Sequence, residues 1–152
     1  MKIRRARDED YAEMARLRRQ TIRHVNARDY SQEIIHRWSA RGGAQTLRTS
    51  AAKCKRWVAL DRDRIVGFAE HTFTCELSRI YVHKDHLRKG IGSRLLAVAE
   101  QSLARQGCKE VRVESTPTAK DFYRKNGYNL IEQGAHEDGA PVYRMLKELG
   151  SE

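Results

Sequence analysis

The sequence predicts a mixed α/β fold, with helices packed on the faces of one mixed sheet. Two observations carry this prediction. In the N-terminal region apolar residues recur at helical spacing, and from Lys55 onward short alternating segments are separated by turns. The C-terminal half then follows the order strand, helix, strand, helix, strand, which is typical of a sheet covered by helices. The 152 residues suit a single domain over residues 1–152.

The N-terminal region is predicted to be mainly helical after a short strand over residues 2–5. Asp8 or Asp10 can cap the first helix. Its apolar residues recur every three to four positions: Tyr11, Met14, Leu17 and Ile22. A second helix is expected over residues 30–39, ended by Gly42 and Gly43. Residues 44–53 give no clear pattern, and no element is predicted there.

The middle of the chain is predicted to form the centre of the sheet. Residues 56–60 and 64–70 are expected to pair as a hairpin around the turn at 61–63. Residues 77–82 are expected to form a third strand. Its alternation predicts one face with Leu77, Arg79 and Tyr81 and the other with Ser78, Ile80 and Val82.

The C-terminal half returns to helical spacing around Gly92. An apolar stripe marks this helix, which ends near Gly107: Ile91, Leu95, Leu96, Ala99 and Leu103. A strand over residues 110–114 follows, and Thr116 and Pro117 are expected to open a short helix. Two closing strands are expected over residues 128–132 and 142–146.

The charge balance indicates attraction to anions. The chain has 30 Lys and Arg against 20 Asp and Glu, a formal net charge of +10. These charges are spread along the chain, which favours a basic surface. With aromatic residues at only 7%, the composition argues against a nucleic-acid-binding module. No apolar run approaches the length of a membrane span, so no membrane partner is expected.

The three cysteines, Cys54, Cys75 and Cys108, are interpreted as buried or half-buried thiols. Their odd number and wide spacing argue against a disulfide framework or a zinc site. Together with an N-terminus that lacks a secretion signal, they predict a cytoplasmic protein without a metal.

The most informative segment is the loop Arg88-Lys89-Gly90-Ile91-Gly92-Ser93, between a predicted buried strand and a predicted helix. The start of a helix has free N–H groups and a partial positive charge. Gly90 and Gly92 would let phosphates approach the backbone, and Arg88 and Lys89 add charge. The glycine spacing of a dinucleotide fold and the Gly-Lys-Ser/Thr ending of a nucleotide P-loop are both absent. A glycine turn that only reverses the chain is the alternative.

Two motifs resemble those of the GCN5-related N-acetyltransferases, the GNAT family. Residues 77–96 resemble the family's motif A, and residues 119–128, with the sequence Ala-Lys-Asp-Phe-Tyr-Arg-Lys-Asn-Gly-Tyr, resemble its later Phe-Tyr segment. The resemblance covers roughly residues 57–146. It implies a central, mostly antiparallel sheet of six to seven strands flanked by about four helices. Leu87 stands where the family has Gln or Arg, so the loop would depend on backbone N–H groups and on Arg88.

The resemblance also implies an acyltransferase that moves the acetyl group of acetyl-CoA to a primary amine in a ternary complex. The protein would be a monomer or a homodimer. The following residues would bind the co-substrate: Ile80, Tyr81, Val82, Leu87, Arg88, Lys89, Gly90, Ile91, Gly92, Ser93 and Tyr123.

Two catalytic residues are expected from the resemblance. Tyr123 is the candidate general acid for the departing thiolate, and the alternative is that it only packs beside Phe122. Glu70 is the candidate general base for the amine, and the alternative is an ordinary strand carboxylate. Other candidate bases are His71, His83 and Asp85.

The acceptor stays open: a small amine, an amino sugar, a polyamine, or a protein N-terminus or lysine. The positive charge disfavours a polyamine. Trp38 and Trp57 are interpreted as core residues. The competing hypotheses are a catalytically silent acyl-CoA sensor of the same fold and a basic nucleic-acid-binding module.

Overall fold

The structure, a computed structural model, describes residues 1–150 and is built on one seven-stranded sheet. The strand order is β1-β2-β3-β4-β5-β7-β6. Only β4 and β5 pair in parallel, so the predicted mixed and mostly antiparallel sheet is confirmed. The strands are β1 (Lys2–Arg5), β2 (Cys54–Asp61), β3 (Arg64–Thr72), β4 (Glu76–Val82), β5 (Glu110–Ser115), β6 (Asn129–Ala135) and β7 (Pro141–Glu148).

Five α-helices accompany the sheet among the described residues. They are α1 (Tyr11–His24), α2 (Gln32–Ser39), α3 (Ala44–Thr49), α4 (Ile91–Arg105) and α5 (Lys120–Lys125). Helix α3 forms where no element was predicted; its six residues carry a single buried apolar side chain, Leu47, too few to show a period. Helix α2 begins later than predicted, because the Ser31 side chain caps it by accepting from the Ile34 N–H at 3.2 Å.

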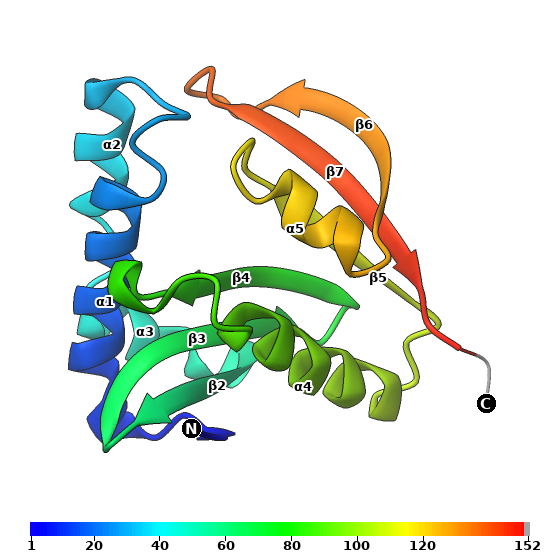
Figure 1. Cartoon of the computed structure of the whole chain (residues 1–152), viewed down its shortest axis with the longest axis horizontal. Coiled ribbons are helices and arrows are strands. Elements are labelled where there is room, and N and C mark those ends of the chain that lie inside the picture. Colours follow the sequence, from blue (N-terminus) through cyan, green and yellow to red (C-terminus); the bar gives the residue numbers. More distant parts are fainter. Residues whose placement is uncertain (151–152) are drawn as a thin grey trace.

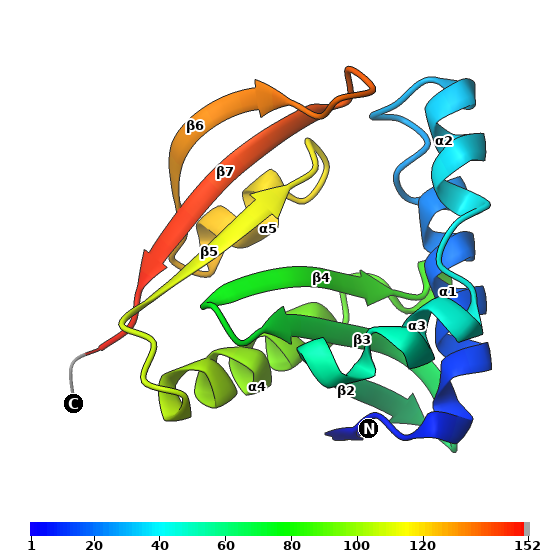
Figure 2. The ribbon, with the colours of Figure 1, turned by 180° about the vertical axis from the view of Figure 1, so that it is seen from behind.

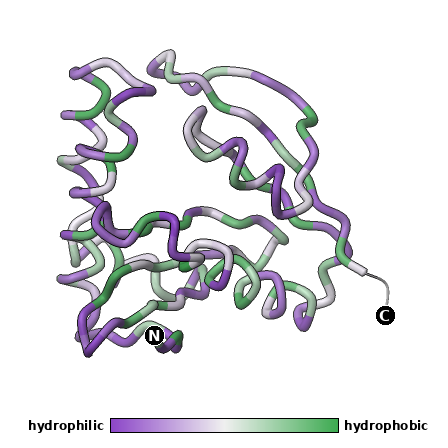
Figure 3. The backbone as a smooth tube through the Cα atoms, viewed as in Figure 1, coloured by the Kyte–Doolittle hydropathy of each residue, from purple (hydrophilic) through white to green (hydrophobic). Residues whose placement is uncertain are grey.

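The first half of the sheet lies between two helical layers (Figures 1 and 2). Helix α4 packs on one face and α1 with α3 on the other. The α4 side holds a cluster of Trp57, Ala59, Val66, Ala69, Ile91 and Leu95. The opposite side holds Tyr11, Met14, Ala15, Leu17, Leu47, Val58, Ile65 and Phe68. The predicted stripes of α1 and α4 therefore supply these layers, and helix α4 alternates hydrophobic and hydrophilic positions along its turns (Figure 3).

The prediction that Leu77 shares one face of β4 with Arg79 and Tyr81 is wrong. Leu77 packs in the α4-side cluster against which Ile80 also lies, rather than on the side of Arg79 and Tyr81. The pairing explains this: Glu70 faces Arg79 but His71 faces Leu77, so the register shifts by one residue at Ser78. Such a bulge moves the following side chains to the other face of the strand.

The second half of the sheet shares its core with α4 and α5. The buried cluster there is Leu77, Leu96, Ala99, Leu103, Cys108, Val111, Val113, Tyr123, Tyr128 and Met145. Over residues 1–150, no helix is both long enough and apolar enough to cross a membrane.

The cysteine prediction is wrong for two of the three residues. Cys75 and Cys108 form a disulfide with their Cα atoms 5.7 Å apart, whereas Cys54 is a buried free thiol. The two residues are 33 positions apart in sequence, yet both precede strands that begin side by side, as the Glu76–Arg112 pairing shows. Since disulfides are typical of oxidising compartments, the cysteines give no support to a cytoplasmic location.

Candidate active site

The two parallel strands separate soon after they begin. Strand β4 pairs with β5 only at Glu76–Arg112 and Leu77–Val113. Beyond these pairs the strands diverge, with α1 and α2 standing across the wide end (Figures 1 and 2). The later part of β4 therefore has an edge without a strand partner among the described residues. A free edge of this kind can pair with an extended ligand.

The backbone of β4 indicates which groups point to this edge. The His83 N–H donates to Val66 O on β3 at 2.8 Å, whereas Val82 O accepts from the Thr21 hydroxyl at 3.5 Å. Successive residues of a strand direct their polar groups to alternate sides. Ile80 and Val82 therefore direct their N–H and C=O groups away from β3.

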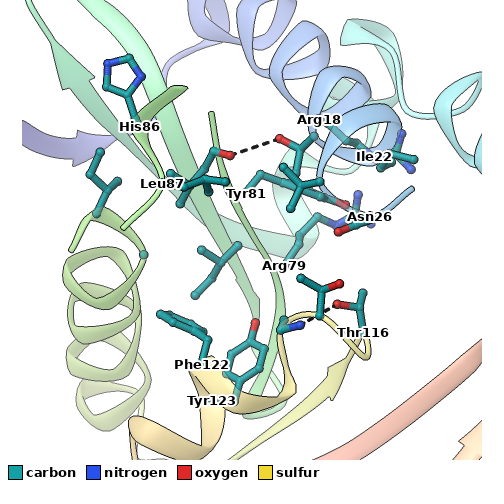
Figure 4. A pocket seen from close by; sticks show the side chains of 18 of the residues that line it. Arg18, Ile22, Asn26, Arg79, Tyr81, His86, Leu87, Thr116, Phe122 and Tyr123 are labelled. Atoms are coloured by element: carbon teal, nitrogen blue, oxygen red, sulfur yellow. Dashed lines mark hydrogen bonds between the residues drawn. The ribbon is translucent and has the colours of Figure 1, made fainter. Parts of the chain in front are cut away.

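A cavity of about 420 Å³ lies along this edge (Figure 4). It is lined by the later part of β4, the start of α4, the loop before α5, α5 itself and the inner side of α1. Most of the predicted co-substrate residues line it: Ile80, Tyr81, Val82, Leu87, Arg88, Gly90, Ile91, Gly92, Ser93 and Tyr123. The structure thus brings the two sequence motifs together around one space. Lys89 is exposed beside it and does not line it.

The glycine loop forms a turn at the start of α4 whose backbone geometry suits an anion. Arg88 and Gly90 adopt positive φ angles of 62° and 79°, which direct successive N–H groups to one side. Gly90 caps the helix without a side-chain hydrogen bond. The first N–H groups of α4 thus have no intrahelical acceptor. At Gly92 a Cβ atom would lie 3.2 Å from the Phe122 ring, so the lack of a side chain lets α5 pack against this turn.

Leu87 adds an apolar side chain to the rim, 42% exposed, in extended backbone. It supplies no side-chain donor at this position. Exposed Arg88 and Lys89 are the neighbouring cations, so the groups available to an anion here are backbone N–H groups and these two side chains.

Tyr123 lies at the base of the cavity, with its hydroxyl directed into it (Figure 4). The residue is 5% exposed, and its ring makes edge contacts with Phe122 and Tyr128 at centroid distances of 5.2 Å and 5.5 Å. Among residues 1–150 no group hydrogen-bonds its hydroxyl. Burial raises the pKa of the Tyr123 phenol above its usual value, so the hydroxyl stays protonated at neutral pH.

Glu70 is buried next to Arg79 and does not line the cavity that contains Tyr123. Its Oε1 accepts from Arg56 Nε at 2.7 Å, and its Oε2 lies 3.2 Å from Arg79 Nε. It lines a second cavity of about 190 Å³ under α3 and not the central one. A carboxylate held by two guanidinium groups has little freedom to take a proton from a distant amine. The role of Glu70 as a general base stays a prediction.

The other candidate bases are also apart from Tyr123. His71 is buried on the α4 side, with Nε2 2.9 Å from Ser102 Oγ, and burial lowers the pKa of its imidazole. The His83 Nδ1 atom accepts from the Asp85 N–H at 3.1 Å, and desolvation lowers the pKa of His83 as well. Asp85 is exposed. None of the three lines the central cavity.

The side of the cavity formed by α1 and α2 was missed by sequence reasoning. Arg18 of α1 and Trp38 of α2 both line it, so the interpretation of Trp38 as a core residue is wrong, while Trp57 is indeed in the core. The Trp38 Nε1–H donates to Asp138 Oδ2 at 2.8 Å, which ties α2 to the turn between β6 and β7. One signal could have revealed Arg18: it stands at helical spacing between Met14 and Ile22, where the apolar stripe of α1 is interrupted.

The described residues contain no group of three or more His, Cys, Asp or Glu side chains placed to hold a metal ion. The central cavity combines a turn suited to an anion, a free strand edge, a protonated phenol and an arginine-containing far side.

Comparisons with known proteins agree with this arrangement. A family model described as an acetyltransferase (GNAT) domain matches residues 26–149. The uncharacterized protein YyaT of Bacillus subtilis (strain 168) is 32% identical over 92 residues, which cover 60% of this chain and 59% of that protein. The match thus spans less than two thirds of that relative.

Two solved structures show the same fold. A GCN5-related N-acetyltransferase from Rhodopseudomonas palustris superposes with a TM-score of 0.91 at 24% identity, covering 97% of this chain and 95% of that one. The PaiA N-acetyltransferase from Thermoplasma acidophilum was solved in complex with coenzyme A. It superposes with a TM-score of 0.83 at 25% identity, covering 97% of this chain and 98% of that one. With the family model matching most of its length, the chain belongs to the GNAT acetyltransferase family.

Proposed function

We propose that this protein transfers the acetyl group of acetyl-CoA to a primary amine by direct attack in a ternary complex. One observation carries the proposal: a single cavity joins the anion-binding turn at α4, the free edge of β4, the Tyr123 hydroxyl and the inner side of α1. A co-substrate and an acceptor can therefore meet inside it without a covalent enzyme intermediate. The coenzyme A complex of the Thermoplasma acidophilum relative supports the choice of co-substrate.

The pyrophosphate would bind at the start of α4. The N–H groups of Ile91, Gly92 and Ser93 are free at this helix end, and the partial positive charge of the helix favours an anion. Arg88 and Lys89 would add attraction at the rim.

The pantetheine arm would follow β4. Its amide groups would pair with the outward N–H and C=O groups of Ile80, as an added strand pairs with a sheet edge. Acetyl-CoA supplies a thioester whose thiolate can leave. The Val82 N–H would polarise the acetyl carbonyl and stabilise the negative charge that develops on its oxygen.

Tyr123 would donate its proton to the departing sulfur. Its hydroxyl points into the cavity, has no other partner among residues 1–150 and stays protonated at neutral pH. These are the properties a general acid needs before the reaction begins.

Glu70 has two possible roles that an experiment can separate. A base working through water would set the acidic limb of the rate-versus-pH profile. A positioning residue would instead hold Arg79 at the cavity, and the 3.2 Å contact between their side chains favours this role. In the second case the amine would enter as its neutral form.

The proposal is tested by binding and then by turnover. Calorimetric titration with acetyl-CoA and with coenzyme A measures co-substrate binding, with ATP as the control for general phosphate attraction. A thiol-release assay over a panel of amines then measures transfer. We expect binding of both CoA species and turnover of at least one amine. Failure to bind any CoA species would refute the proposal, and binding without turnover of any amine would indicate an acyl-CoA sensor instead.

A further inference from the structure

We propose that the acceptor amine also carries a carboxylate, and that Arg18 and Arg79 bind this carboxylate on the α1 side of the central cavity. The proposal names the acceptor class of the transfer described above and therefore rests on it. Two guanidinium groups from different elements, α1 and β4, line the same cavity as Tyr123 (Figure 4). Arginine is well suited to bind a carboxylate, because its planar donors match the two oxygens.

Arg18 is a half-buried cation without a counter-charge. Its Nη1 donates to Trp38 O at 3.0 Å and to Arg41 O at 2.8 Å, and its buried Nε has no acceptor. Within residues 1–150 no carboxylate lies at ion-pair distance from it. Burial lowers the pKa of the Arg18 guanidinium, the nearby Tyr81 side chain raises it in part, and the charge of Arg79 lowers it further. A desolvated charge is costly unless a partner compensates it, so an anionic group of the ligand would be stabilised here.

Arg79 also retains positive charge toward the cavity. Its carboxylate partner Glu70 is shared with Arg56, whose Nε lies closer, at 2.7 Å against 3.2 Å. Two guanidinium groups thus share one carboxylate, which leaves this cluster with a net positive charge. The Arg79 side chain is 38% exposed, so it can reach a ligand.

The cavity provides fewer negative groups for a cationic acceptor than positive groups for an anionic one. Glu114 is the only carboxylate among the described residues that line it, and its Oε2 accepts from Arg144 Nε at 3.1 Å, an arginine that it shares with Glu132. A polyamine would therefore meet three arginines, Arg18, Arg79 and Arg88, and a single carboxylate that already contacts an arginine. The same positive charges disfavour an ammonium group and favour the neutral amine, which is the form that attacks.

The test compares acceptors that differ only in the carboxylate. Glycine, β-alanine and γ-aminobutyrate vary the distance between amine and carboxylate, and their amides serve as neutral counterparts. Spermidine supplies a cationic acceptor, and phosphoethanolamine separates a phosphate from a carboxylate. We expect kcat/KM to be highest for one of the carboxylate-bearing amines and spermidine to be a poor acceptor.

Arg18→Gln should lower kcat/KM for the carboxylate-bearing acceptor about 10- to 100-fold and leave that for its amide nearly unchanged. Arg19→Gln is the matched control. Arg19 Nε donates to Ser39 O at 3.1 Å, so this change also removes a hydrogen bond between α1 and α2, but Arg19 does not line the cavity. A purely structural role of Arg18 would reduce activity on both acceptors equally.

Several results would overturn the proposal. These are equal turnover of carboxylate and amide acceptors, a preference for spermidine or for phosphoethanolamine, and an equal effect of Arg18→Gln on both acceptors. The proposed function would stand in each case, since transfer still occurs.

If no amine is acetylated, that function fails. Titrating N-acetyl-β-alanine, N-acetylglycine and N-acetyl-γ-aminobutyrate into the coenzyme A complex then still tests the anion site: binding lost in Arg18→Gln supports it, and no binding to the wild type refutes it.

Discussion

Replacing Tyr123 with Phe separates catalysis from folding more cleanly than any other change at this site. The hydroxyl has no hydrogen-bond partner among the described residues, so its removal leaves no group unpaired. The ring contacts with Phe122 and Tyr128, at 5.2 Å and 5.5 Å, would persist in the variant. We therefore expect the free energy of unfolding to change by no more than about 0.5 kcal/mol.

The effect on turnover should be much larger. Removing a general acid costs about 10²-fold in rate, and a loss of at least about tenfold is expected in kcat for Tyr123→Phe. Binding of coenzyme A should stay close to that of the wild type, because backbone groups and the start of α4 would hold it. Thiol release measures kcat, calorimetry measures coenzyme A binding and urea unfolding measures stability.

Tyr128→Phe is the matched control. The Tyr128 hydroxyl donates to Glu100 Oε2 at 2.7 Å in the core behind Tyr123, so this variant should lose about 1 kcal/mol or more of stability and keep its turnover. Unchanged turnover in Tyr123→Phe would remove this residue from the mechanism. A large loss of stability in Tyr123→Phe would contradict the finding that the Tyr123 hydroxyl has no hydrogen-bond partner among the described residues.

Three further predictions concern other parts of the molecule. Glu70→Gln should leave the acidic limb of the rate-versus-pH profile in place and raise KM for the acceptor, whereas loss of that limb would identify Glu70 as the base. Gly92→Ala should raise KM for acetyl-CoA severalfold in steady-state kinetics, because its Cβ would lie 3.2 Å from the Phe122 ring; an unchanged KM would argue against close packing at this turn. Replacing both Cys75 and Cys108 with Ala should lower the free energy of unfolding by about 3–4 kcal/mol, from the 33-residue separation that the disulfide spans. Equal urea midpoints with and without a reductant in the wild type would show that this disulfide does not stabilise the fold.

The sequence by itself determined most of the elements and the position of the glycine turn before α4. Helical spacing identified α1 and α4, and alternation identified β2 to β5, because these patterns reflect which side of an element is buried. The turn at Arg88 to Ser93 was recognisable since it needs glycines and a helix start close together in the chain. Helix α3 had too few residues to show a period, and α5 begins at Lys120 rather than near Pro117.

Only the tertiary structure decided what surrounds this turn. The single-residue shift at Ser78 sent Leu77 to the opposite face, and no local pattern encodes it. The sequence offered Glu70 as a candidate general base with an ordinary strand carboxylate as the alternative, and only folding placed it between two arginines. The pairing of Cys75 with Cys108 and the position of Arg18 in the cavity depend on segments far apart in the chain. The cavity itself arises where β4 and β5 part and α1 crosses the opening, so its lining becomes visible only when the sheet and its helices are assembled.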